Sequence, residues 1–102
     1  MKKLRVLAEA RKEFADALRY YRRQAPAFAE ALALEYRQIV RHAQEFPDAG
    51  AVEAASESIP VRRFLLHQFP YKVLIANLPD QIVVIAFVHA KRKPGYWLER
   101  IP

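Results

Sequence analysis

The sequence predicts an α+β domain in which a helical hairpin packs on one face of a small, mostly antiparallel sheet. Three observations predict it. Two long segments of helical periodicity come early in the chain, strand-like segments follow them, and a tight-turn sequence separates two of those strands. With 102 residues the chain can build one hydrophobic core but not two, so we expect a single domain spanning residues 1–102.

The N-terminal half is predicted to form a short strand and two helices. Residues 3–8 alternate weakly and predict the strand, and a helical period begins at Glu9. One face of the first helix is apolar and carries Phe14, Leu18 and Tyr21. Pro26 ends this helix and can occupy the first turn of the next, which is predicted to extend to about Phe46. A link this short predicts an antiparallel hairpin.

The C-terminal half is predicted to supply the rest of the sheet. Residues 48–58 are small and polar and predict a surface loop. Three strands are then predicted, over residues 59–66, 71–76 and 82–89. Asn77–Asp80 contains turn-forming residues and predicts a tight turn. The last strand is apolar without alternation, which is typical of a central strand buried on both faces. A short tail follows the predicted order β-α-α-β-β-β.

Composition excludes several kinds of chemistry. The chain has no cysteine, so it can form neither disulfides nor a thiolate nucleophile. Its three histidines follow no metal-binding spacing, and its two glycines form no phosphate-binding loop, so we expect no metal and no cofactor.

The longest apolar run, Ile82–Val88, is too short to cross a bilayer, and the basic start lacks the apolar stretch of a secretory signal. We therefore expect a cytoplasmic protein without a membrane partner.

Positive charge gathers in the C-terminal part of the chain. The net charge is +6 at pH 7. Residues 58–102 hold seven Lys or Arg against two acids, whereas residues 1–57 hold ten against nine. This imbalance predicts a surface that attracts an acidic partner, either nucleic acid or an acidic protein segment. The plainer alternative is that the charge only aids solubility.

Short motifs are spread along nearly the whole chain. They are Leu7, Ala10, Glu13 and Phe14, the pair Tyr20–Tyr21, Val61–Phe64 (VRRF), Phe69–Tyr71 (FPY) and His89–Arg100 (HAKRKPGYWLER). In this order, and with the order β-α-α-β-β-β, the chain resembles the RelE/ParE family of toxins. The resemblance implies the toxin of a type II toxin–antitoxin pair, of the kind linked to plasmid stabilisation, which arrests growth and is neutralised by a cognate antitoxin.

The resemblance implies two targets from different classes. ParE-like members poison DNA gyrase, whereas RelE-like members are ribosome-dependent endonucleases that cut mRNA, and a shared scaffold does not choose between them. We slightly favour gyrase, because residues 48–58 contain Glu53 and Glu57 but no lysine, whereas RelE uses lysines in that neighbourhood. A non-toxic structural relative is a further alternative.

The resemblance also implies where a site would lie. If the protein is a nuclease, the matching positions are the catalytic candidates His89, Arg63, Arg92 and Tyr96. His89 would move a proton, the arginines would hold phosphate, and Tyr96 or Trp97 would stack on a base. Contacts to a partner or to nucleic acid are expected from Arg62, Lys91, Lys93, Trp97 and Arg100.

These residues also have structural alternatives. A lone histidine such as His89 can cap its strand by bonding a backbone carbonyl. An acidic neighbour can neutralise Arg63, and Tyr96 with Trp97 can pin the tail to the domain. The run Lys91–Lys93 can be a solvated edge.

The predicted architecture gives an antitoxin a physical place to bind. A small two-layer domain leaves sheet edges and a cationic face exposed. An extended chain that is acidic and amphipathic can cover them by adding a strand and docking a helix.

Overall fold

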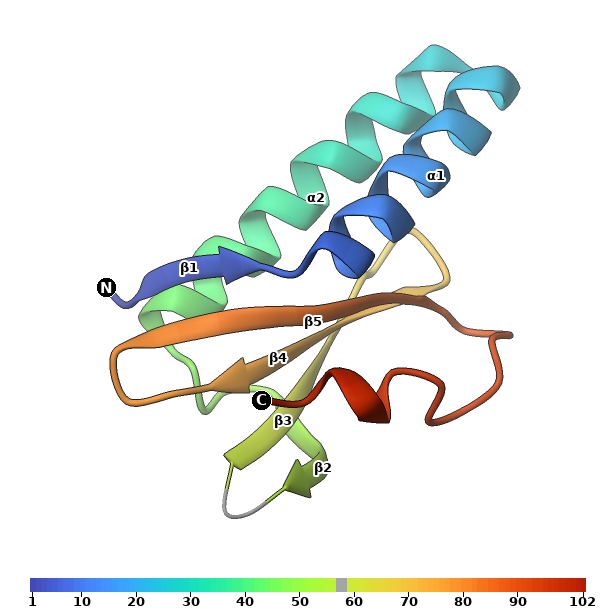
Figure 1. The fold of residues 1–102 in the computed structure, drawn as a ribbon. Helices are drawn as coiled ribbons and strands as arrows, with labels where there is room; N and C mark the ends of the chain where they lie inside the picture. The colour runs from blue at the N-terminus through green and yellow to red at the C-terminus, as the bar shows by residue number, and fades with distance from the viewer. Residues whose placement is uncertain (57–58) are drawn as a thin grey trace.

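The computed structural model describes residues 1–56 and 59–102 and confirms the predicted α+β class. A long helical hairpin lies on one side of a twisted sheet, and the C-terminal tail lies on the other (Figure 1). The helices are α1 (Ala8–Gln24) and α2 (Pro26–Glu45), and the tail contains a short 3-10 turn, η1 (Leu98–Arg100). The strands are β1 (Lys3–Val6), β2 (Ala51–Ser56), β3 (Ile59–Leu65), β4 (Tyr71–Asn77) and β5 (Gln81–His89).

The helical hairpin forms where the apolar periodicity predicts it. A single residue, Ala25, links the helices with extended backbone (φ −166°, ψ 128°), as expected before proline, and Pro26 opens α2. Aromatic rings join the hairpin to the sheet. The ring centroid of Phe14 lies 4.1 Å from that of Tyr36 in α2 and 5.3 Å from that of Phe87 in β5. These contacts fix the hairpin on the sheet.

The sheet has the strand order β1-β5-β4-β3-β2. β1 is parallel to β5, and every other neighbouring pair is antiparallel. β5 lies between β1 and β4, and each residue from Ile82 to Val88 is buried, as predicted for a central strand. The predicted turn over Asn77–Asp80 joins β4 to β5, with the Leu78 N–H bonded to the Gln81 carbonyl at 2.9 Å.

One segment differs from the sequence prediction. The surface loop predicted over residues 48–58 is wrong for residues 51–56, which form strand β2, while residues 57 and 58 lie outside the described part of the chain. β2 is rich in alanine, which has low strand propensity, so its structure comes from antiparallel pairing with β3 rather than from its own sequence. A bulge at Glu53 interrupts the register.

Each face of the sheet has its own hydrophobic core. On the helix side the buried strand residues are Phe64, Val73, Ile75, Ile82, Val84 and Phe87. On the tail side they are Val61, Leu74, Ala76, Val83, Ile85, Ala86 and Val88. Trp97 of the tail covers the second face and is only 3% exposed. Burial on both faces accounts for the unbroken apolar sequence of β5.

Candidate functional site

The C-terminal half of β5 extends beyond the end of β1 and has an open edge. β1 pairs with β5 only over Gln81–Val84. Beyond that point, side chains take the place of a neighbouring strand. The Phe87 N–H donates to Glu13 Oε1 at 3.1 Å, and Arg100 Nη1 donates to the Ile85 carbonyl at 3.2 Å. Backbone groups that would otherwise be buried without partners are therefore satisfied.

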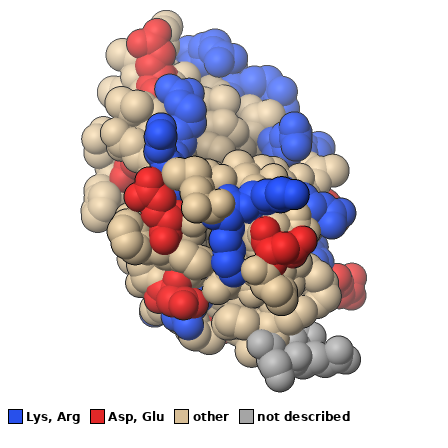
Figure 2. All heavy atoms as spheres, turned by 90° about the vertical axis from the view of Figure 1, so that its left-hand side faces the viewer, with Lys and Arg blue, Asp and Glu red and all other residues tan. Residues whose placement is uncertain are grey.

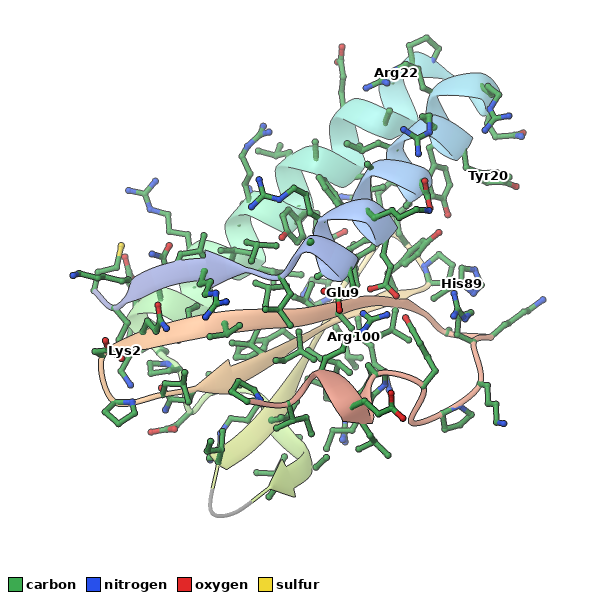
Figure 3. The ribbon with its side chains drawn as sticks, in the orientation of Figure 1. Lys2, Glu9, Tyr20, Arg22, His89 and Arg100 are labelled. Carbon is green, nitrogen blue, oxygen red and sulfur yellow. The ribbon has the colours of Figure 1, made fainter. Side chains whose placement is uncertain are left out.

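Glu13 is the centre of a network that joins α1, β5 and the tail. Its side chain is 15% exposed, and its Oε2 accepts a hydrogen bond from the Tyr96 hydroxyl at 2.6 Å. Arg100 donates to both carboxylate oxygens, at 2.9 Å from Nη1 and 3.3 Å from Nη2. Figure 3 shows Arg100 beneath β5, with its side chain directed toward the start of α1. A charged pair this far from water is stable only when its hydrogen bonds are satisfied, as they are here.

The network shifts the pKa of Tyr96 and that of Arg100. Burial raises the pKa of Tyr96, and its hydrogen bond to Glu13 and the negative charge of Glu13 raise that pKa further. Burial opposes the charge of Arg100, but the hydrogen bond and charge of Glu13 outweigh it, so the pKa of Arg100 is raised. At neutral pH Tyr96 is a donor committed to Glu13 and not a group poised to exchange its proton with a substrate.

His89 caps the turn that follows β5. Its ring packs edge-on against Tyr71 of β4, with 5.0 Å between the centroids. Its Nδ1 accepts a hydrogen bond from the Lys91 N–H at 3.0 Å, and its carbonyl accepts one from the Arg92 N–H at 3.0 Å. Nδ1 accepts only when it is unprotonated, so the neutral ring carries its proton on Nε2. In this form the free side of the imidazole is a hydrogen-bond donor and not a base.

Arg92 lies flat against the ring of Tyr96. Its Cζ is 4.0 Å from the ring centroid, and the Cζ of Arg100 is 5.2 Å from the same centroid. Arg92 is exposed, and within residues 1–56 and 59–102 no carboxylate pairs with it. The stacking holds this unpaired guanidinium in a defined place, where it can bind a carboxylate or a phosphate.

Two grooves meet at His89 and Arg92. The first, of about 580 Å³, lies between α1, the adjoining ends of β4 and β5, and the tail. The second, of about 350 Å³, lies on the tail side of the sheet and has a mainly apolar lining. Four residues line both grooves: Pro70, Tyr71, His89 and Arg92. Tyr20 of α1 lines the first groove, and Figure 3 shows it on the same side of the molecule as His89.

Arg63, the fourth catalytic candidate, lines neither groove. It pairs in register with Leu74 of β4, whereas His89 pairs with Tyr71, so the two side chains leave opposite faces of the sheet. Arg63 Nη1 lies 3.8 Å from Glu53 Oε1. The same carboxylate accepts hydrogen bonds from Lys72 at 2.7 and 2.8 Å. Arg63 is thus partly neutralised by an acidic neighbour.

The residues expected to contact a partner divide into exposed and packed groups. Lys91 and Lys93 are exposed on the turn after β5. Trp97 and Arg100 instead hold the tail on the domain, and Arg62 donates to the Gly50 carbonyl at 2.8 Å. Of these five residues, only the two lysines are exposed and, within the described chain, make no side-chain contact that holds them to the domain.

The sequence analysis did not assign Glu13 to the site. Its position could have indicated such a role, because Glu13 lies on the stripe of α1 that carries Ala10 and Ala17, both buried in the structure. An acid on an apolar helix face requires a partner. Tyr71, which carries the ring beside His89, is a second residue whose role was not predicted.

No group of three or more His, Asp or Glu side chains that could hold a metal ion occurs in the described residues, and none of their helices is long and apolar enough to span a bilayer.

Comparison with known proteins identifies a shared fold. No family model and no curated protein matches the chain. Among solved structures, the chain is similar to one in the structure described as "Chromosomal ParDE TA system from P. aeruginosa". That match has a TM-score of 0.73 and 16% sequence identity, and it covers 89% of this chain and 98% of the other. Identity this low supports the architecture and leaves the function to the residues.

Proposed function

We propose that this chain is the toxin of a type II toxin–antitoxin pair, that it arrests growth by poisoning DNA gyrase, and that a cognate antitoxin neutralises it. Two observations from different sources support the toxin assignment. The fold is similar to that of a chain from a ParDE toxin–antitoxin system along 89% of this sequence. The motifs that resemble RelE/ParE toxins run from Leu7 to Arg100, along nearly the whole chain. Both targets and the antitoxin lie in the cytoplasm, where we propose the protein acts.

The arrangement of the candidate catalytic residues supports a protein target rather than RNA. Cleavage of RNA by its 2′-hydroxyl needs a base, an acid and cations around a single phosphate. Tyr96 is committed to Glu13, and the His89 ring offers no unprotonated nitrogen to the grooves. Arg63 leaves the face of the sheet opposite to that of His89 and lines neither groove. A surface of this kind is better suited to gripping a protein than to cutting RNA.

A ribosome-dependent mRNA endonuclease is the second candidate. The observation that favours it is the unpaired guanidinium of Arg92 beside His89, where two grooves meet. A guanidinium in that place can hold a phosphate, and an imidazole can donate to a leaving oxygen. If expression of the chain does not affect growth, the result would instead support the further alternative, a non-toxic structural relative.

Expression of the chain alone in a bacterial host tests the toxin assignment and separates the targets. A toxin arrests growth, whereas normal growth with verified soluble protein would overturn the assignment. Gyrase poisoning induces the DNA-damage response and traps cleaved DNA complexes. An endonuclease instead halts translation rapidly and cuts mRNA in the ribosomal A site.

The variant His89→Ala sharpens this experiment. Arrest by gyrase poisoning should largely survive the substitution, whereas arrest by RNA cleavage should be lost. Arg23→Ala is a matched control, because Arg23 is an exposed cation near the end of α1 that lines neither groove.

A further inference from the structure

Glu35 in α2 is the most deeply buried charged residue of the described chain. Only 7% of it is exposed, and within residues 1–56 and 59–102 no basic side chain forms an ion pair with it. The carboxylates of Glu13 and Glu53, by contrast, have basic partners. Other charges reach the solvent, as Figure 2 shows for Lys, Arg, Asp and Glu side chains on one face of the molecule. Burial of a carboxylate without a counter-charge costs stability and requires hydrogen-bond donors around it.

Those donors are two backbone N–H groups of the loop between β3 and β4. The His67 N–H donates to Glu35 Oε2, and the Gln68 N–H donates to Glu35 Oε1 at 3.2 Å. His67 and Gln68 are exposed and belong to no helix or strand, so no ladder of backbone hydrogen bonds orders them. Hydrogen bonds to a carboxylate are stronger than those between neutral groups. The Glu35 side chain therefore holds this loop against α2.

The same loop forms walls of both grooves. Phe69 and Pro70 line the groove on the tail side, and Pro70 also lines the groove beside α1. The ring centroid of Phe69 lies 5.0 Å from that of Tyr21, and the Phe69 carbonyl accepts a hydrogen bond from the Tyr71 N–H at 2.8 Å. Figure 1 shows this loop and the end of β5 on the same side of the molecule. A shift of the loop would change the shape of both grooves.

A backbone hydrogen bond joins the loop to the turn that carries Arg92. The Pro70 carbonyl accepts it from the Ala90 N–H at 2.7 Å. Ala90 follows His89 directly, and the His89 carbonyl accepts a hydrogen bond from the Arg92 N–H at 3.0 Å. Glu35 lines neither groove. It is nevertheless connected, through the loop and Ala90, to the residues at which the grooves meet.

We infer that Glu35 is a positioning residue, whose carboxylate holds the β3–β4 loop so that the junction of the grooves at His89 and Arg92 keeps the shape that a protein target recognises. The inference rests on the proposed function, because that function gives the grooves a protein target. Glu35 itself contacts no target. An apolar residue in its place would be buried at lower cost but would leave the loop untethered. The buried charge thus serves the conformation of the binding surface and not the stability of the domain.

Amide hydrogen exchange on the full-length chain tests the connection from Glu35 to the turn. Glu35→Gln keeps the size of the side chain but replaces one acceptor oxygen with an NH₂ group, which cannot accept a hydrogen bond. Exchange at Gln68 and at Ala90 should become at least about tenfold faster relative to the slowest amides of β5. Unchanged exchange at Ala90 would overturn the inference, because the carboxylate would then act on the loop alone.

Equilibrium binding to purified DNA gyrase separates positioning from a merely structural role. Glu35→Met removes the charge and keeps an unbranched side chain, so the free energy of unfolding in urea should stay unchanged or rise. Binding should nevertheless weaken at least about tenfold. Val40→Ala is the matched control, because Val40 is equally buried in α2 and takes no part in the hydrogen bonds to the loop. It should lower stability and change the affinity by less than about twofold while the chain is folded.

Two results of the binding experiment would contradict the positioning role. One is wild-type affinity in Glu35→Met, and the other is a loss of affinity that follows the loss of stability in the same proportion for Glu35→Met and Val40→Ala. Failure of the proposed function looks different, because the wild-type chain itself would then bind no gyrase. Exchange at Ala90 needs no target, so it decides the connection from Glu35 to the turn in that case as well.

Discussion

The carboxylate of Glu13 accepts a hydrogen bond from the Phe87 N–H at 3.1 Å, in the position where a neighbouring strand would offer its carbonyl. Because β1 stops short, this side chain from α1 completes the edge of the central strand. The same carboxylate binds Tyr96 and Arg100. One acidic residue thereby couples the helical hairpin, the sheet and the tail that carries the candidate site.

Neutralising Glu13 should destabilise the whole domain. Glu13→Gln leaves the largely buried Arg100 without its counter-charge and should lower the free energy of unfolding by about 2–3 kcal/mol. Urea denaturation measures the change. Glu30→Gln is the matched control, because Glu30 is exposed on α2. An equal effect of the two substitutions would show that the Glu13 network contributes nothing specific.

Stability should fall at alkaline pH, with Tyr96 as one of the causes. Because its pKa is raised in the folded chain, Tyr96 holds its proton more tightly there than in the unfolded chain. Its contribution to stability is therefore complete below the unfolded pKa of about 10 and is lost as the pH rises from there toward the folded pKa. Tyr96→Phe should reduce the slope of unfolding free energy against pH above about 10. An unchanged slope would contradict the assignment.

The turn before η1 should require glycine. Gly95 has φ +82°, and an added Cβ would lie 3.1 Å from Leu98 Cδ1. Gly95→Ala should cost about 1–2 kcal/mol and loosen the tail, whereas Gly95→Asn should cost less because asparagine tolerates this conformation better. Trp97 is the only tryptophan, so its fluorescence reports whether the tail stays docked. Equal emission spectra and equal stabilities for the two variants would contradict this explanation.

Growth arrest should depend on Arg92 and not on Arg63. Arg92→Ala removes the unpaired cation at the junction of the grooves and should weaken arrest at least about tenfold, measured as the inducer needed for half-maximal inhibition. Arg63→Ala should have little effect, because Arg63 lines neither groove and lies beside Glu53. The reverse order of effects would contradict the placement of the functional surface at the junction of the grooves.

Local patterns in the sequence predicted most of the fold. The apolar period of α1 and α2, the proline at their junction and the unbroken apolar run of β5 each determine a local structure. β2 was not predicted because its residues do not show a pattern typical of a strand. Its conformation follows from pairing with β3. Pairing of this kind is a tertiary effect, which a single sequence does not display.

The candidate site was only partly predictable for a related reason. His89, Arg92 and Tyr96 are close in sequence and are also brought together by the turn after β5. The separation of Arg63 from His89 depends on strand register, which reverses the face of a side chain with each shift of one residue. The role of Glu13 depends on contacts with Tyr96 and Arg100, more than eighty positions away.

The most direct test of the proposed function uses purified components. The chain is incubated with DNA gyrase, ATP and supercoiled plasmid, and in parallel with ribosomes translating a defined mRNA. Our account predicts gyrase-dependent accumulation of cleaved plasmid, retained by His89→Ala, and an intact mRNA. Cleavage of the mRNA in the ribosomal A site, lost in His89→Ala and accompanied by no effect on gyrase, would contradict it.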